Sequence, residues 1–332
     1  MKISASRVNV FATCPRQYYY KYVEKAPTDT DFVEPDYFSF GNVLHRILEL
    51  CVELPNFDFE QIYKVVSDEP PKPQKTASEW EVSNYEQILK RCEFIKNQKD
   101  ECFKGKMFLM YTVFKKLLRN NPQIKILATE KRIETQHAVI VIDAIMVIDD
   151  KWYIIDYKTT SGSLENTKDL SPMHKNSQVS LYAAHKEIIE MMMLKEKIKY
   201  EFGGVGFIHF NKLSTNKMTK KDTDYLSYAN RLMEDNEDGK FIRVALVDKE
   251  NIDVQEALAN FQVQKDKILE LHNPHGKDFG AMNRQACVPF NLSPCPYFSK
   301  CHGNLLSQPE FVKVFKGTDK IDFKQIDDPF SF

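Results

Sequence analysis

The chain of 332 residues is long enough for one large core or two smaller ones, and its net charge of -1 excludes binding to nucleic acid through the overall field. With 42% hydrophobic and 28% charged residues, it is neither disordered nor fibrous. No apolar run reaches the roughly 18–20 residues of a membrane span, and no signal-peptide pattern opens the chain, so we expect a cytoplasmic protein that does not bind membranes.

Helical patterns dominate the first part of the chain. We predict a helix over Ser4–Tyr22 that breaks at Pro15, because proline disrupts a helix interior. Apolar residues form one stripe over Phe40–Glu53, which predicts a second helix, and a long helical stretch follows over Ser78–Asn120. We therefore expect an N-terminal helical region at residues 1–122.

Strand patterns follow the helical region. Three runs rich in Ile, Val and Tyr, which are IKILATEKRIET, HAVIVIDAIMVIDD and KWYIIDYKTT, predict a β-meander over residues 124–158. Thereafter we predict a helix, a strand and two more helices, at residues 176–196, 203–210, 222–235 and 252–272. This order predicts an α/β core over residues 123–275.

Two acidic residues and a lysine lie on the second and third predicted strands. Asp143 follows the apolar run AVIVI, so we expect it at the end of its strand. Asp156 and Lys158 are two residues apart and share a face of the next strand, where an antiparallel neighbour can place Asp143 beside them. Carboxylates that bind Mg²⁺ or Mn²⁺ beside a lysine suit phosphodiester hydrolysis. The alternative is an ordinary Asp156–Lys158 ion pair on a solvated face.

The segment IDAIMVIDDKWYIIDYKTT resembles the core of the RecB-like branch of the PD-(D/E)xK nuclease superfamily. Three further motifs occur in the order of that branch, namely ASRVNVFATCPRQYYYKY, GNVLH at residues 41–45 and QVSLY at residues 178–182. The resemblance implies a restriction-endonuclease-like α/β fold, with a mixed central sheet flanked by helices. It also implies a catalytic centre made of Asp143, Asp156 and Lys158.

The resemblance assigns roles to residues that have ordinary alternatives. It makes His45 a metal ligand together with Asp143, Asp156 and the backbone carbonyl of Tyr157, although a histidine beside an apolar stripe is more often structural. It makes Gln178 and Tyr182 contacts of the DNA strand, although residues four apart on a helix also pair with each other. Glu130, on the first predicted strand, is expected to be either an additional acidic residue of the site or an ordinary surface charge.

Four of the seven cysteines occur near the two ends of the chain. In a reducing compartment cysteines are thiols or metal ligands, and CVPFNLSPCPYFSKC lacks the close cysteine pair of common zinc sites. Relatives among the CRISPR-adaptation nucleases and AddB-type helicase–nucleases carry an iron–sulfur clamp. The resemblance therefore implies a 4Fe–4S cluster, with zinc or unrelated buried thiols as alternatives, held by Cys14, Cys287, Cys295 and Cys301.

The same resemblance implies the remaining organisation and function. We expect a cysteine clamp at residues 276–304 that packs on the N-terminus, and a flexible tail at residues 305–332. The expected activity is that of a DNA exonuclease acting on ends or single strands in replication, recombination or repair, in a bacterial or phage-infected cell. The sequence has no P-loop, so a helicase, a recombinase or a single-strand-binding protein is an expected partner. The alternatives are a CRISPR-adaptation nuclease that processes spacer precursors and a non-cleaving DNA-binding module.

Overall fold

The chain forms two compact units, Met1–Asn9 with Glu34–Asn273 and Val10–Val33 with Pro274–Phe332. The computed structural model describes residues 2–28, 36–74, 79–98, 101–135, 138–160, 164, 177–195, 200–213, 217–236, 240–272 and 295–302. Among the helices of these segments, none combines the length and the apolar composition that a bilayer-spanning segment needs.

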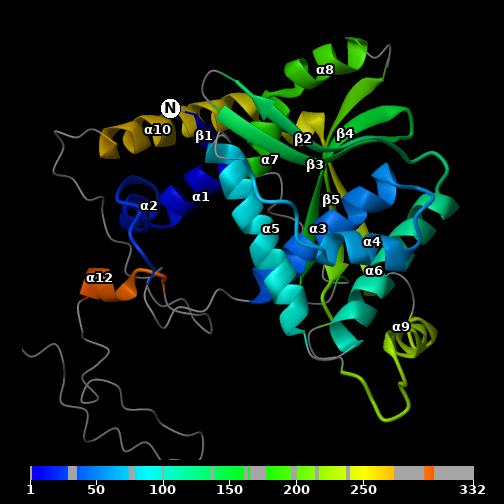
Figure 1. Cartoon of the computed structure of the whole chain (residues 1–332). Helices are drawn as coiled ribbons and strands as arrows, with labels where there is room; N and C mark the ends of the chain where they lie inside the picture. The colour runs from blue at the N-terminus through cyan, green and yellow to red at the C-terminus, as the bar shows by residue number, and fades with distance from the viewer. Residues whose placement is uncertain are drawn as a thin grey trace, which may run out of the picture. The chain divides into compact units, whose positions relative to one another are not determined.

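A mixed six-stranded sheet forms the centre of the larger unit (Figure 1). The order along the sheet is β1-β3-β4-β5-β6, with β2 also paired to β3; β1 and β3 are parallel, as are β4 and β5, and the other pairs are antiparallel. The predicted meander of β2, β3 and β4 is confirmed, whereas β1 and β6 were not predicted. The strands are β1 (Ile3–Ser4), β2 (Lys125–Glu134), β3 (Ala138–Ile148), β4 (Lys151–Thr160), β5 (Glu201–Asn211) and β6 (Ile242–Asp248).

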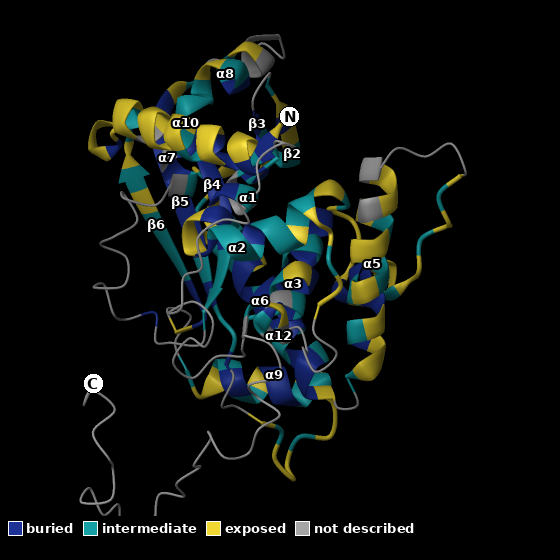
Figure 2. Cartoon of the chain, turned by 90° about the vertical axis from the view of Figure 1, so that its left-hand side faces the viewer, coloured by how far each residue is buried: buried dark blue, intermediate teal, exposed yellow. Residues whose placement is uncertain are grey.

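Helices cover both faces of this sheet, as expected for the predicted fold class. One face packs against α3 (Asp36–Glu53), α4 (Phe59–Ser67), α5 (Glu79–Asn97), α6 (Glu101–Asn120) and α9 (Tyr225–Glu234). The other face packs against α7 (Ser177–Ala184), α8 (Lys186–Lys195) and α10 (Val254–Leu271). Figure 2 shows the buried strands between these layers, and the exposed outer sides of α5 and α10.

Two of the predicted helices are wrong in extent, because each is two helices in the structure. The stretch predicted at residues 78–120 is divided between α5 and α6, and the one predicted at residues 176–196 is interrupted at His185. A ring nitrogen of His185 lies 2.7 Å from the carbonyl oxygen of Leu181. A side chain that contacts its own helix backbone in this way competes with the regular hydrogen bonds and favours an end to the helix.

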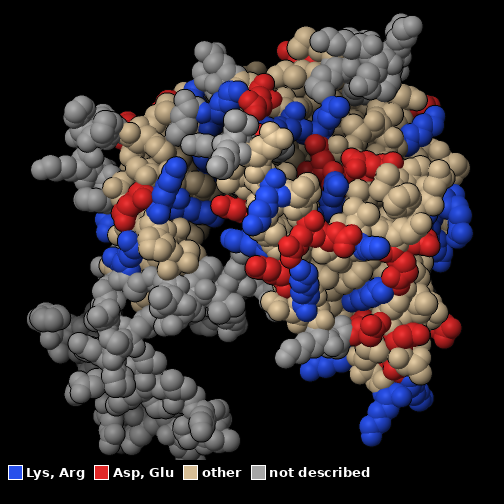
Figure 3. Space-filling view, in the orientation of Figure 1, with Lys and Arg blue, Asp and Glu red and all other residues tan. Residues whose placement is uncertain are grey.

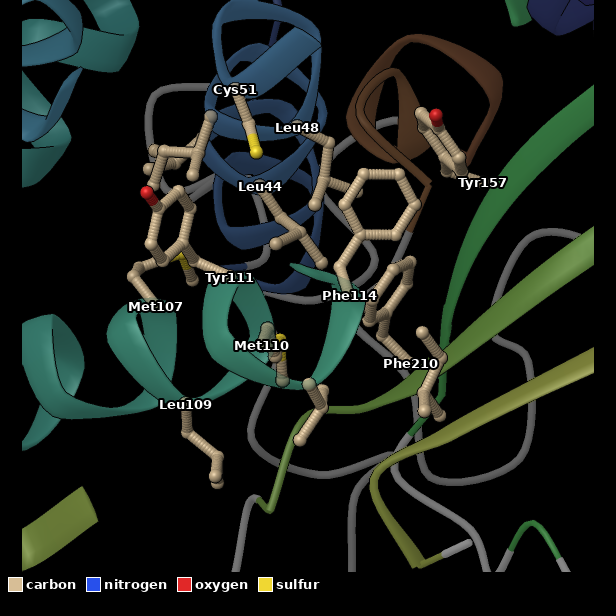
Figure 4. Close-up of a cluster of buried hydrophobic side chains, with 14 of the residues drawn as sticks. Leu44, Leu48, Cys51, Met107, Leu109, Met110, Tyr111, Phe114, Tyr157 and Phe210 are labelled. Carbon is tan, nitrogen blue, oxygen red and sulfur yellow. The ribbon is translucent and has the colours of Figure 1, made fainter. Parts of the chain in front are cut away.

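Successive residues of the strands enter two different cores. Met146 and Ile155 face the first core, while Val147 and Ile154 face the second, as the two-residue period of a strand requires. Figure 4 shows the first core, in which α3 and α6 pack against strands β4 and β5. The ring of Phe114 lies 6.0 Å from that of Tyr157, measured between centroids. This packing fixes α6 against β4.

The smaller unit contains short helical segments from both ends of the chain. Cys14 separates α1 (Ala5–Thr13) from α2 (Pro15–Tyr18), which confirms the predicted break, and a π-helical turn follows at Tyr19–Val23. The second segment contains α12 (Phe298–His302). The rings of Tyr20 and Tyr297 lie 5.7 Å apart, and Lys300 pairs with Glu24 at 3.1 Å, so the two segments contact each other.

Candidate functional site

Asp143 lies in the middle of β3, so the prediction that it ends its strand is wrong. The apolar residues after it continue the strand because they pair with β4, and that pairing ends at Ala144 and Ile155. Beyond this point the Oδ2 atom of Asp143 accepts a hydrogen bond of 2.7 Å from the backbone N–H of Tyr157. The carboxylate thus takes the place of the next backbone contact between the two strands.

Along β3, side chains alternate between the two cores, and this alternation shifts by one residue at Asp143. Ile140 and Ile142 face the second core, whereas Ala144 faces the first. On β2, Glu130 lies between the residues that pair with Ala144 and Ile142, and its φ of 43° is in the left-handed region, which is uncommon for a side-chain-bearing residue. Such local strain concentrates at functional sites.

His45 completes a group of three possible metal ligands with Glu130 and Asp143. One ligand atom from each residue lies within 4.8 Å of the others, and His45 Nδ1 is 3.5 Å from Asp143 Oδ1. The His45 ring packs edge-on against Tyr157, with 5.7 Å between the ring centroids. Two carboxylates and an imidazole are donors that suit Mn²⁺ and, for the oxygens, Mg²⁺.

Burial and, after it, crowded negative charge perturb the titratable groups here. Burial raises the pKa of Glu130 to about 7, and the nearby charges of Asp143 and Glu49 add to this. Burial and Asp143 raise the pKa of Asp156 to about 6 against the opposing effect of Lys158. Burial lowers the pKa of His45, but the charge and hydrogen bond of Asp143 outweigh it, so the net pKa is raised. A divalent cation would relieve this repulsion between carboxylates.

A second group of side chains surrounds Asp156. Its Oδ2 atom lies 2.6 Å from the ammonium of Lys158, and its Oδ1 atom accepts a hydrogen bond of 2.7 Å from the amide of Gln178. Lys158 also donates to the side-chain Oε1 atom of Gln178 at 3.2 Å. Oδ2 of Asp156 is buried and its charge is balanced by this ammonium, so a cation bound there would share the carboxylate with Lys158.

Gln178 and Tyr182 lie one turn apart on α7 and contact each other. Tyr182 is buried, and its hydroxyl donates to the carbonyl oxygen of Val141 at 3.1 Å. These contacts hold α7 against the strands that carry Asp143 and Asp156. Contact of either α7 residue with a DNA strand stays a prediction, as does the role of the Tyr157 carbonyl.

The structure therefore places the predicted residues in two adjacent groups. Asp143, His45 and Glu130 form the first, while Asp156 and Lys158 belong to the second, outside the compact group of ligand atoms. The hydrogen bond from Tyr157 to Asp143 joins them. Glu130, expected either as an additional acidic site residue or as an ordinary surface charge, falls opposite Asp143 in the antiparallel register.

An open cavity of about 850 Å³ extends from the first group, and sequence reasoning did not anticipate it. His45 and Glu130 form part of its wall. Three arginines line it as well, namely Arg46 of α3, Arg91 of α5 and Arg132 of β2.

The predicted cluster cysteines lie in the smaller unit. Cys14 is buried, whereas Cys295 and Cys301 are half-buried. Cys287 lies outside the described residues. The other three cysteines are buried in the larger unit, as predicted for core residues, namely Cys51, Cys92 and Cys102.

Comparison with known families identifies a relationship for most of the chain. A model described as the PD-(D/E)XK nuclease superfamily matches residues 2–302. This range includes α3, the whole sheet and α7, and so both groups of side chains. No curated protein matches the sequence.

Proposed function

The chain belongs to the PD-(D/E)XK nuclease superfamily, and we propose from the geometry of its site that it is a metal-dependent deoxyribonuclease that hydrolyses phosphodiester bonds. The observation that carries this proposal is the ligand group of His45, Glu130 and Asp143 beside the Asp156–Lys158 ion pair. Neither group alone provides both a site for a cation and a mobile positive charge.

The donor atoms fit Mg²⁺ or Mn²⁺, which would be held by Asp143, Asp156 and His45, with Glu130 and the Tyr157 carbonyl as additional ligands. A bound cation would supply an activated water and would neutralise charge on the phosphate. Lys158, whose side chain is 39% exposed, is accessible to a substrate and holds a positive charge where the attacked phosphate gains negative charge. Gln178 positions that ammonium and the carboxylate of Asp156 at the same time.

Within the superfamily, we propose a RecB-like exonuclease acting on DNA ends or single strands in replication, recombination or repair. The support is the order of the motifs that carry Cys14, His45, Asp143, Asp156, Lys158, Gln178 and Tyr182. Because the chain lacks a P-loop, a helicase, a recombinase or a single-strand-binding protein is the proposed partner. A CRISPR-adaptation nuclease has the same site and is the second candidate.

We further propose a 4Fe–4S cluster held by Cys14, Cys287, Cys295 and Cys301, in a clamp at residues 276–304. The support is that the segments around Cys14 and Cys301 belong to the same unit and contact each other through Tyr20 and Tyr297. Burial and the nearby Cys301 raise the pKa of Tyr20, which agrees with cysteine sulfur beside this ring. Four thiolates also accept Zn²⁺, which is the alternative.

The test is cleavage of end-labelled single- and double-stranded DNA in Mg²⁺ or Mn²⁺ by the wild type and by Lys158→Ala. We expect the variant to lose at least about a hundred-fold in rate, because a preorganised positive charge at the reacting phosphate is lost. Removal of Lys158 leaves a buried carboxylate without its cation, so circular dichroism must show that the variant is folded.

Lys151→Ala is the matched control, since Lys151 is exposed on the same strand. We expect it to cleave like the wild type, and EDTA to stop both. Wild-type rates in a folded Lys158→Ala variant would refute the proposed catalytic centre. A wild type that binds DNA but cleaves neither substrate in either metal would favour a non-cleaving module.

A further inference from the structure

The cavity beside the ligand group has a wall built by one face of α5. Asn84, Gln87, Ile88 and Arg91 all line it, and their spacing of three, four and seven residues places them on one side of a helix. Three of these four side chains carry hydrogen-bond donors. The opposite walls come from α3 and β2, which carry His45 and Glu130. The wall of α5 is thus continuous with the proposed catalytic centre.

Arg91 has a guanidinium whose Nε atom is buried and has no hydrogen-bond partner in the described segments. A charged donor that is removed from water without a partner is costly, and arginine remains protonated in proteins. The other two arginines of the wall differ, because Arg46 pairs with Glu49 and Arg132 pairs with Glu134. Of the acidic wall residues, Glu69 is also paired, with Lys96.

We propose that Arg91, together with Asn84 and Gln87, forms a phosphate-binding subsite that holds the DNA backbone one or more nucleotides from the bond that is cut. The inference rests on the proposed nuclease function. A planar guanidinium and amide groups on one face match the oxygens of a phosphodiester, which accept several hydrogen bonds. The strand enters the catalytic centre along α5.

The surface charge supports discrete phosphate contacts. Figure 3 shows lysines and arginines interspersed with acidic residues over the face that it presents. With a net charge of -1, the chain cannot hold DNA through a general attraction alone. Arg91 lies in the wall of an open cavity that acidic residues also line, so a phosphate there would be held by directed hydrogen bonds and not by a broad positive field.

The test measures binding of a fluorescent single-stranded oligonucleotide by anisotropy in EDTA, where no cleavage occurs. For Arg91→Ala we expect roughly ten-fold weaker binding, the loss of one charge-assisted contact. The slope of log K against log salt concentration should fall by about 0.7, the value for one phosphate of a single strand. Arg91→Lys should recover part of the affinity and Lys90→Ala, an exposed neighbour outside the cavity wall, should bind like the wild type. In the cleavage assay, KM should rise in Arg91→Ala while kcat changes little.

Oligonucleotides with one neutral methylphosphonate linkage locate the contact. At one position the neutral linkage should weaken wild-type binding about as much as Arg91→Ala does, and should add nothing in that variant, because both changes remove the same contact. If the wild type binds and cleaves DNA but Arg91→Ala retains its affinity and salt slope, the subsite is refuted and the nuclease proposal stands. Equal sensitivity of both proteins at every linkage also refutes it. A wild type that neither binds nor cleaves DNA refutes both proposals.

Discussion

Glu130 offers a test of the metal site that does not depend on catalysis. Its carboxyl has an ordinary pKa of 4.5 and a pKa of about 7 in the folded protein, raised first by burial and then by Asp143 and Glu49. Below pH 4.5 the carboxyl is neutral in the folded and the unfolded chain, so it costs nothing. The contribution of Glu130 to the stability of the folded state falls progressively as the pH rises from 4.5 to about 7, and this penalty stays constant above that.

The size of this penalty follows from the gap between the two pKa values. At about 1.36 kcal/mol per pKa unit, the charged carboxylate costs the metal-free protein about 3 kcal/mol above pH 7. Glu130→Gln keeps the shape of the side chain and removes the charge. We therefore expect the variant to be about as stable as the wild type at pH 4.5, and about 3 kcal/mol more stable at pH 8 without metal.

The assay is urea unfolding at both pH values, first in EDTA and then with Mg²⁺ or Mn²⁺. Metal should raise the free energy of unfolding of the wild type by about 2.7 kcal/mol at a hundred times its dissociation constant, and should do so less in the variant. Glu134→Gln on the same strand is the control with the opposite sign, because Lys2 and Arg132 lower the pKa of Glu134. A Glu130→Gln variant whose stability relative to the wild type is the same at both pH values would refute the reasoning.

Two further predictions concern the support of the site and the cysteines. Tyr182→Phe removes a buried hydroxyl that accepts from Gln178 and donates to Val141, so the free energy of unfolding in urea should fall by about 1–2 kcal/mol. The control Tyr85→Phe, at a half-buried position, should change it little. A Tyr182→Phe variant of unchanged stability would contradict the hydrogen-bond network. Cys295→Ser should abolish the iron content and visible absorbance of anaerobically purified protein, whereas Cys102→Ala in the larger unit should not. A colourless wild-type protein that contains zinc would show that the cysteines form a zinc site and not an iron–sulfur cluster.

Much of the fold could be predicted because strand and helix periods are local properties of the chain. The apolar stripe of α3 and the three strands of the meander were visible without any tertiary information. The two-residue strand β1 is too short for a recognisable period. The break at His185 depends on a contact between a side chain and its own helix, which a stripe of apolar residues does not reveal.

The arrangement of the site was less predictable, because the prediction rested on a regular alternation of side-chain directions along β3. Alternation alone would put Asp143 directly beside Asp156, but the phase of β3 changes at Asp143, opposite the left-handed Glu130. Such a change depends on the pairing of two strands and not on either sequence alone. The same limit applied to Arg91, because one exposed-looking arginine in a helix gives no sign of a cavity that α3, α5 and β2 form together.

The change of phase explains why the site has two groups of side chains and not one. It turns Asp143 towards α3, where His45 and Glu130 complete a set of donors for a cation. Asp156 stays with α7, where Gln178 fixes its carboxylate and the ammonium of Lys158. A strand of regular pleat would have placed both carboxylates on one face, where repulsion would have raised the pKa of Asp156 further. With the two groups on different supports, a cation could draw on Asp143 and Asp156 together. Gln178, which contacts both Asp156 and Lys158, would keep the ammonium close when the metal takes a share of that carboxylate.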